Sequence, residues 1–501
     1  MPDAPRLEGD ISTDVLVIGS GIAGLSCAYE LMQTGRQVTV IDRSELVSGQ
    51  SARTTAHLSY ACDDYYTELI KVLGGDAARH YYNSQKAAVD RIETIITRED
   101  IDCDFARVDA YLFPAKDEDT DYLKDELKAC HRIGFDETSW ADAGTLEWTD
   151  RPALKFPRQA RFHPLKYLRA LIEVLQKSGV SLYAGTPVTR LDEDNSGVTA
   201  ITPYGVVQAR QVVVATNSPF HLLVSLHTKQ APYRTYAAAF KVPKGTVANA
   251  LYWDTEEPGY HYVRLQPEME HDLLIIGGED HKSGDADDGE GRLAALEHWA
   301  RERWPDLGRR VTGWSGQVYE PADYVPYIGR SPGFNEVYLV TGDSGEGITT
   351  GVLAGLMLRD QLNAVPNPWE ALYDPNRKPR HLETVGEYLT ENLTVVKGMA
   401  EQVLKASKPD AETIKAEISD LNELAPSQGA IYNADKGKVA AYRDAAGEVH
   451  LMSAKCTHAG CIIHWNEFEH CWDCPCHGSQ FATDGRVLNG PASTPLAAVE
   501  K

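Results

Sequence analysis

Asp14-Val-Leu-Val-Ile-Gly-Ser-Gly-Ile-Ala-Gly24 predicts the fold of the N-terminal part of the chain. Its short apolar run is typical of a buried parallel strand, and the glycines that follow have the spacing Gly-x-Gly-x-x-Gly. A helix is expected next, over residues 25–32, and a second strand over 38–41 with Asp42 at its end. The stretch therefore predicts a complete β-α-β unit.

Each glycine of this motif has a physical role in binding a dinucleotide. Gly19 makes the tight turn, Gly21 lets the backbone approach a pyrophosphate, and Gly24 allows close packing of helix and strand. The helix N-terminus offers N–H groups and a positive dipole to phosphate. Asp42, 18 positions after the last glycine, would accept hydrogen bonds from a ribose. No second unit of this kind follows in the sequence, which predicts one dinucleotide site.

A second informative stretch lies near the C-terminus, where Cys456-Thr-His458 is followed after fifteen residues by Cys474-Pro-Cys-His477. Two thiolates and two imidazoles in such pairs are the ligands of a Rieske [2Fe–2S] cluster, with Cys on one iron and His on the other. Such clusters accept an electron at roughly −150 to +300 mV, against about −400 mV for plant-type clusters. Because Cys₂His₂ is also a structural zinc set, zinc is the alternative.

Features beside the ligands favour the iron–sulfur cluster over zinc. Cys461 and Cys476 stand one in each ligand loop, placed so that they could pair as a disulfide. Ser479 offers a hydroxyl to a cluster sulfur, and Gly490-Pro-Ala492 supplies a third loop that could cover the metal. The segment 425–501 resembles the Rieske domains of respiratory and photosynthetic cytochrome complexes. A disulfide there would be unusual in a reducing cytoplasm, and it would need shielding between the loops.

One position departs from those domains, which commonly have a Tyr two places after the Ser. There its hydroxyl bonds to a ligand sulfur, whereas this chain has Phe481. Loss of a donor near the sulfurs destabilises the reduced, more negative cluster. We therefore expect a reduction potential in the lower part of the Rieske range.

The two sites together favour FAD as the dinucleotide, because a flavin, unlike nicotinamide, can convert two electrons into single ones for the cluster. Further stretches resemble the FAD-dependent oxidoreductase family that includes D-amino-acid oxidase and sarcosine oxidase. Val212–Asn217 looks like its strand followed by Ala-Thr, and Val337–Thr349 has its strand, Gly-rich turn and helix. The resemblance covers about residues 12–375, and it implies a flavin enzyme that acts on amines or amino acids.

The resemblance also implies which residues hold FAD, since they lie in the glycine motif, the loop after the second strand, the strand start at Val188, the strand followed by Ala-Thr and the later Gly-rich turn. These are Gly19, Gly21, Gly24, Asp42, Arg43, Ser51, Thr54, Thr55, Val188, Ala215, Thr216, Gly342, Gly345, Gly347 and Thr349. The last turn is expected to place backbone N–H groups against the flavin ring. Some relatives attach FAD covalently through a His or Cys. Thr54 occupies the aligned position here, so His57 is expected to be a polar neighbour of the flavin and no attachment site.

The expected fold class is α/β plus all-β. Residues 1–375 form the FAD-dependent oxidoreductase, 376–424 a connector of charged amphipathic helices that includes 411–418, and 425–501 a Rieske domain resembling a β-sandwich. Within the first part, a Rossmann-like FAD-binding domain alternates with an inserted substrate domain. The FAD-binding pieces are expected at about 10–85, 155–225 and 320–375, with a helical insert at about 86–154 and an antiparallel pocket floor at about 226–319.

Composition disfavours several classes of partner. The net charge of −24 disfavours nucleic acid and anionic membranes. No run of eighteen apolar residues occurs, so no transmembrane helix is expected. The N-terminus lacks a basic stretch followed by an apolar one, so no secretory signal is expected either. We therefore expect a cytoplasmic protein, and a homo-oligomer stays open.

The leading functional hypothesis is a flavin dehydrogenase. A C–H bond next to an amine nitrogen gives a hydride to FAD, and electrons then pass singly to the Rieske cluster and to an external acceptor. Because a neutral amine can lose hydride unaided, no side chain is required as a base. The candidate pocket residues are Tyr260, Tyr262, Arg264, His281 and Glu346, and Arg264 could clamp a substrate carboxylate.

Three other functions stay open or are disfavoured. Electrons could flow in reverse, from an external donor through the cluster to FAD and a substrate. The chain could also be a substrate-free electron-transfer protein that serves a partner oxygenase. A ferredoxin reductase using NAD(P)H is disfavoured by the missing second nucleotide motif. The chain is not itself a Rieske oxygenase, because its 16 His lack the Asp/Glu-x₂-His-x₄-His spacing of a mononuclear iron site.

Overall fold

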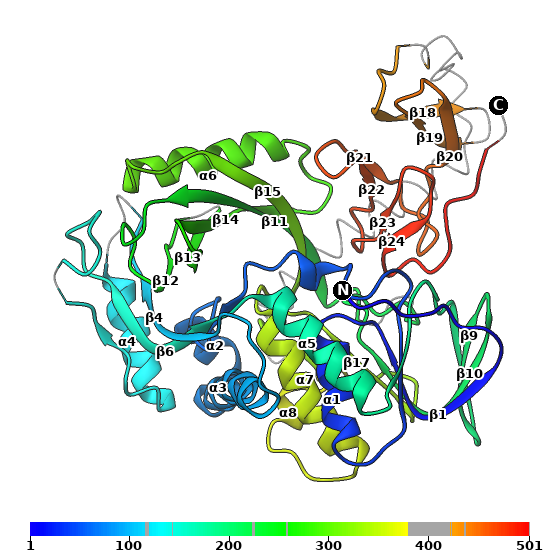
Figure 1. Ribbon diagram of the computed structural model, residues 1–501, viewed down its shortest axis with the longest axis horizontal. Helices are drawn as coiled ribbons and strands as arrows, with labels where there is room; N and C mark the ends of the chain where they lie inside the picture. Colours follow the sequence, from blue (N-terminus) through cyan, green and yellow to red (C-terminus); the bar gives the residue numbers. More distant parts are fainter. Residues whose placement is uncertain are drawn as a thin grey trace.

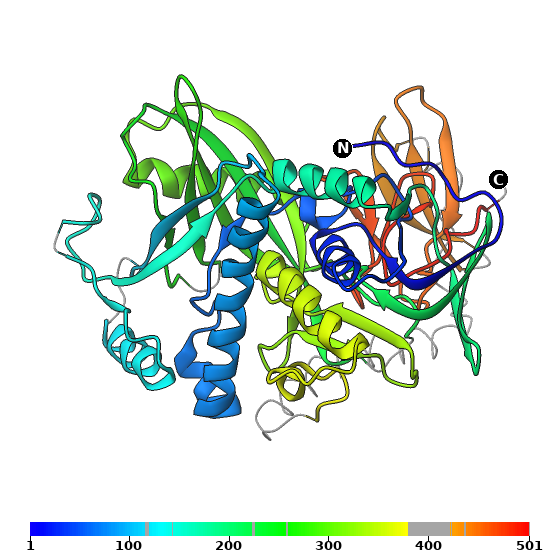
Figure 2. The ribbon, with the colours of Figure 1, turned by 60° about the horizontal axis from the view of Figure 1, so that its bottom comes forward.

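The computed structural model describes residues 1–115, 120–142, 144–222, 226–256, 259–378, 421, 423–434 and 437–499. The helices predicted in the connector, 411–418 among them, lie outside these residues. None of the helices in the described ranges has both the length and the apolar character that a membrane span requires. The C-terminal part (orange to red) and α4 (Asp121–Ile133, cyan) lie at opposite ends of the molecule in both views (Figure 1, Figure 2).

The predicted β-α-β unit is the centre of an eight-stranded sheet. β1 (Ile11–Ile18) pairs in parallel with β2 (Val38–Ile41) on one side and with β10 (Gly205–Val214) on the other. Residues 15–18 are buried on both faces of the sheet, which explains their continuous apolar run. The remaining strands are β7 (Ser181–Tyr183), β8 (Arg190–Asp194), β9 (Gly197–Thr202), β16 (Tyr327–Arg330) and β17 (Val337–Thr341).

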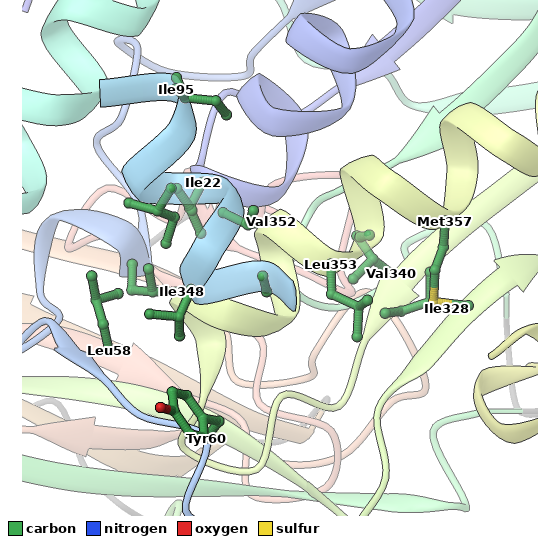
Figure 3. Packing of buried hydrophobic residues seen from close by; sticks show 14 of the residues in the cluster. Ile22, Leu58, Tyr60, Ile95, Ile328, Val340, Ile348, Val352, Leu353 and Met357 are labelled. Carbon is green, nitrogen blue, oxygen red and sulfur yellow. The ribbon is translucent and has the colours of Figure 1, made fainter. Parts of the chain in front are cut away.

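Helices cover this sheet and hold its core. α1 (Ile22–Met32) packs against α7 (Gly347–Leu362), and Gly351 of α7 lies so close to α1 that an added Cβ would come within 2.9 Å of Ile22 Cγ2. Figure 3 shows Ile22 and Val352 among the buried side chains of this packing. The further helices of this part are η1 (Gln50–Ala52), α2 (Tyr66–Leu73), α3 (Gly75–Arg98), α5 (Pro164–Lys177) and α8 (Glu370–Tyr373).

A nine-stranded sheet forms the second layer of the oxidoreductase part. Its long strands β11 (Gln230–Val242), β14 (Asp272–Lys282) and β15 (Arg310–Pro321) pair antiparallel, and α6 (Gly289–Arg303) packs on them (Figure 1). The sheet continues through β13 (His261–Pro267), β12 (Leu251–Trp253), β4 (Ala106–Leu112), β6 (Leu154–Arg161), β5 (Ser139–Trp140) and β3 (His57–Leu58). The predicted insert at 86–154 is therefore not helical throughout, because β4 and β5 belong to this sheet.

Two small antiparallel sheets make up the C-terminal part. β18 (Gly429–Ala434), β19 (Gly437–Arg443) and β20 (Val449–Ser453) form the outer one. The inner one lies nearer to the oxidoreductase part (Figure 1). It consists of β21 (His464–Asn466), β22 (Cys471–Asp473), β23 (Gln480–Phe481) and β24 (Val487–Asn489). The predicted class, α/β with an all-β C-terminal part, is confirmed, whereas the domain boundaries stay predictions.

Candidate functional site

A cavity of about 810 Å³ lies where the two large sheets and the C-terminal part meet. Every residue predicted to hold FAD lines this cavity except Gly24. The C-terminal part contributes to the same wall, through Glu469, Cys471, Gln480, Asn489 and Gly490 among others. One cavity is therefore bounded both by the predicted dinucleotide motif and by the part of the chain that holds the predicted cluster ligands.

The glycine turn has the shape that a dinucleotide requires. A Cβ at Gly19 would lie 2.3 Å from the carbonyl oxygen of Ala215, and one at Gly24 would lie 1.8 Å from that of Gly19. Gly21 caps α1 and has no side chain to cap it, the N–H of Ile22 donates to the Ser51 hydroxyl oxygen at 2.9 Å, and the first residues of the helix line the cavity. The helix N-terminus at the cavity wall and the close backbone approach thus fit the pyrophosphate of FAD.

Asp42 lies at the cavity wall, where its carboxylate is fixed by local donors. Ser20 donates its backbone N–H and its hydroxyl to Oδ2, at 2.8 and 2.7 Å, and the N–H of Ser44 donates to Oδ1 at 3.0 Å. Oδ1 accepts only one of these bonds and therefore keeps acceptor capacity. The proposed contact with a ribose hydroxyl is therefore compatible with this geometry.

Three of the five candidate pocket residues line the cavity, namely Tyr260, Tyr262 and Glu346. Arg264 and His281 are not among the described residues of its wall. Arg264 is buried elsewhere and donates to Gln266 Oε1 at 3.2 Å, and His281 stacks on Tyr236. The prediction that Arg264 clamps a substrate carboxylate therefore has no support in this geometry.

Two carboxylates that the sequence reasoning missed lie in the cavity wall. Asp63 accepts a hydrogen bond from the Tyr260 hydroxyl at 3.1 Å, and Asp280 follows the Gly277-Gly278 pair on β14. Burial raises the pKa of Asp63 to about 6 and that of Asp280 to about 7. The acidic pair Glu279-Asp280, which follows the two glycines in a pocket strand, was a signal that could have pointed to Asp280.

The four predicted cluster ligands come together in the C-terminal part. The rings of His458 and His477 are 5.0 Å apart, and Cys456 and Cys474 are within hydrogen-bonding reach of each other. The Nδ1 atom of His477 is buried and has no hydrogen-bond partner. A histidine that binds iron needs a ring nitrogen without another hydrogen-bond partner, and two such imidazoles must lie close together. The donor set therefore fits a Rieske cluster.

The surroundings of these ligands also match the sequence expectations. A disulfide joins Cys461 to Cys476, one cysteine from each ligand loop. The Ser479 hydroxyl donates to the thiol sulfur of Cys456, and its oxygen accepts the backbone N–H of Ala492 at 3.0 Å. Phe481 is fully buried in the core of this part.

The ligand loops rest directly on the oxidoreductase part, which sequence reasoning did not anticipate. The Tyr319 hydroxyl donates to the backbone carbonyl of His477 at 3.0 Å. Gln317 donates to the carbonyl of the next residue, Gly478, also at 3.0 Å. The ring of His227 lies 4.8 Å from that of His458 and 5.4 Å from that of His477. The histidine side of the cluster site therefore faces inward.

Ion pairs hold the two parts together. Arg234 of β11 donates to Asp473 at 2.7 Å, with only 2% and 8% of the two side chains exposed. Arg53 pairs with Glu469 nearer to solvent. These four residues are far apart in sequence and belong to no motif, so no local signal could have found them.

Comparison with known proteins agrees with both halves of the structure. The family of FAD dependent oxidoreductases matches residues 14–361, and the Rieske [2Fe-2S] domain matches residues 415–500. The Rieske 2Fe-2S iron-sulfur protein YhfW of Bacillus subtilis is 29% identical, over 100% of this chain and 96% of its own length.

Two further similarities concern the oxidoreductase part alone. Gamma-glutamylputrescine oxidoreductase of Escherichia coli is 27% identical over 73% of this chain and 87% of its own length. The crystal structure of glycine oxidase from Geobacillus kaustophilus superposes with a TM-score of 0.62 at 19% identity, over 73% of this chain and 99% of that one. At that identity the superposition shows a shared fold.

Proposed function

Since the chain belongs to the FAD-dependent oxidoreductase family and carries a C-terminal Rieske domain, we propose that it oxidises a small amine or amino-acid-like substrate at FAD. Electrons then pass one at a time to its own [2Fe–2S] cluster and to an external acceptor. FAD supplies a two-electron acceptor and the cluster a one-electron acceptor. The name of the relative that acts on gamma-glutamylputrescine supports an amine as substrate.

The observation that carries this proposal is the chain of hydrogen bonds between the cluster loops and the cavity wall. Tyr319 donates through its hydroxyl to the carbonyl of His477, a predicted iron ligand. Its own backbone carbonyl accepts the N–H of Ser344 at 3.0 Å, and its N–H donates to Asp343 at 3.3 Å. Asp343 lines the cavity within the Gly-rich turn that is expected to face the flavin ring. Hydrogen bonds through one tyrosine therefore connect the two sites.

The residues of the chain have separable roles in this function. The N-terminus of α1 would hold the pyrophosphate, and the fixed carboxylate of Asp42 would orient the ribose. At the other end of the cavity, Trp253, Tyr260 and Tyr262 line the wall and would exclude water from the reacting C–H bond. The four ligands would hold the cluster, with the disulfide tying their two loops together.

The test is anaerobic mixing of the holoprotein with NADH and then with a panel of amines and amino acids. We expect loss of flavin absorbance with an amine but not with NADH, followed by the EPR signal of a reduced Rieske cluster. Loss of absorbance with NADH alone would favour a reductase instead. Flavin bleaching without a cluster signal would show that the two centres do not exchange electrons.

A further inference from the structure

We propose that the substrate end of the cavity selects a substrate that carries an ammonium group but no carboxylate group, and that Asp63 and Asp280 determine this specificity. The inference rests on the proposed function and narrows its substrate class from amines and amino acids to cationic amines. It concerns the part of the cavity between β13, β14 and the turn before α7, which lies beyond the glycine motif.

The two aspartates have acceptor capacity that faces the cavity. Tyr260 donates to Asp63 Oδ2, and Thr235 donates its hydroxyl to Asp280. The Thr235 hydroxyl oxygen also lies 2.7 Å from that of Tyr262, and either hydroxyl can donate in this contact. The Oδ1 atom of Asp280 is buried and has no hydrogen-bond partner. A buried carboxylate oxygen without a donor, in the wall of a cavity, is a site for a ligand N–H.

Aromatic rings complete a site of this kind. Tyr260 and Tyr262 lie with their ring centroids 5.6 Å apart, and both line the cavity together with Trp253. The faces of such rings attract ammonium groups, by about 0.5–1 kcal/mol at exposed sites and more when water is excluded. Carboxylates and aromatic rings in one wall thus favour a cation over a neutral or anionic group.

Basic side chains are placed where they cannot receive a substrate carboxylate at this end. The basic residues of the described wall are Arg43, Arg53, His57 and Arg486. Arg43 approaches the carbonyl of Ala492 and Arg53 pairs with Glu469, so both face the C-terminal part, to which Arg486 itself belongs and where it pairs with Asp484. Burial lowers the pKa of His57 to about 3, which keeps the ring neutral. A carboxylate entering beside Asp63 and Asp280 would lose its hydration without gaining a cationic partner.

The nearest cation outside the wall is also engaged. Arg292 of α6 lowers the pKa of Asp280, but it donates to Asp288 and to the carbonyl of Glu279, both at 2.7 Å. Burial outweighs this influence and leaves the pKa of Asp280 at about 7 and that of Asp63 at about 6. An entering cation favours the ionised carboxylates. Binding of a cation should therefore tighten as the pH rises from about 5.5 to 8.

Of the other titratable groups facing the two aspartates, the tyrosines stay neutral in this range, whereas Asp64 titrates within it. Burial holds the pKa of Tyr81, Tyr260 and Tyr262 above the ordinary value, so the phenols stay neutral. Burial also raises the pKa of Glu346 well above its usual range, and Tyr81 donates to that carboxyl at 2.6 Å. Asp64, whose pKa burial raises to about 7, accepts the Ser344 hydroxyl and adds to the same pH dependence.

The test uses two probes of similar shape, one cationic and one anionic. In both, the carbon bonded to the charged group carries no hydrogen, so neither probe can be oxidised there. These are tert-butylammonium and pivalate, titrated into the oxidised holoprotein while the visible flavin spectrum is followed. At pH 8 we expect the Kd of tert-butylammonium to be at least tenfold lower than that of pivalate. We also expect it to rise at least tenfold in Asp280→Asn and in Asp63→Asn, and on lowering the pH to 5.5.

A matched control is Asp285→Asn, which removes the same charge from an exposed side chain five positions along the chain from Asp280 and outside the cavity wall. It should leave both Kd values unchanged, and unaltered flavin content and cluster EPR signal would show that all variants fold. Pivalate binding as tightly as tert-butylammonium, or insensitivity of the cation to both cavity variants, would overturn the inference. Because these probes are not oxidised, that outcome is independent of whether electrons pass between FAD and the cluster.

Discussion

The two redox sites are built in different ways. The FAD site is made mostly of backbone, in a turn where Gly19 and Gly24 leave no room for a side chain. The cluster site is made of side chains, from loops that pack against the oxidoreductase part through Tyr319 and the Arg234–Asp473 pair. The first site depends on one contiguous stretch of sequence, whereas the second depends also on residues more than a hundred positions away.

This difference means that the two sites should fail independently when their own ligands are removed, but should be coupled through the interface. Backbone sites are sensitive to any added atom, because a Cβ would require the turn itself to move. Buried ion pairs are sensitive to loss of one partner, because the other partner is left as an uncompensated charge in the low-dielectric interior of the protein.

The largest expected effect separates the two sites. In Gly24→Ala the new methyl would overlap the carbonyl of Gly19, so flavin content should fall at least tenfold, while the cluster EPR signal remains. In Cys456→Ser the cluster should be lost and flavin should remain. Absorbance and EPR of the purified variants measure both. Loss of both groups in either variant would contradict independent sites.

A second, smaller effect concerns the interface. Asp473→Asn leaves Arg234 buried without its anionic partner, which should lower the free energy of unfolding of the C-terminal part by about 3–5 kcal/mol. Urea titration followed by the visible circular dichroism of the cluster measures this. The control is Glu469→Gln, where the partner Arg53 is 37% exposed and the expected loss is about 1 kcal/mol or less. Equal losses in the two variants would show that burial of the pair does not matter.

The smallest expected effect is on the cluster potential. Phe481 leaves the cluster without the hydroxyl that cytochrome-complex Rieske domains commonly have, so we expect a potential in the lower part of the range of roughly −150 to +300 mV. Phe481→Tyr should raise the reduction potential by up to about 60 mV. One hydrogen bond contributes about 0.5–1.5 kcal/mol, and a tenfold change in a one-electron equilibrium constant corresponds to about 59 mV. A redox titration that finds the wild type near the top of the range would contradict this account.

The sequence predicted those parts that depend on neighbours along the chain. The β-α-β unit, the glycine contacts and the two ligand pairs follow from local spacing, and the family comparison confirms both cofactor domains. The same reasoning placed Arg264 at the substrate, but that side chain lies on β13 among Arg161 and Gln266, outside the cavity. Which face of a strand meets a cavity depends on sheet packing, and alternation alone does not reveal it.

What sequence reasoning missed depends on contacts between distant segments. His227 lies beside the cluster ligands, and Asp63 meets Tyr260 across the cavity, although neither stands in a motif. The strands β4 and β5 join the large sheet by pairing with β6 and β12, although the segment that contains them was predicted to be helical. Long-range pairing of this kind decides the structure where local preference is weak.

The central claim is that FAD and the cluster exchange electrons within the protein, across the contact made by Tyr319. Rapid freeze-quench EPR after anaerobic mixing with a substrate amine tests it most directly. We predict that the cluster signal grows with a first-order rate that does not change when the protein is diluted tenfold. A flavin that bleaches while the cluster stays oxidised, or a rate proportional to protein concentration, would contradict the claim.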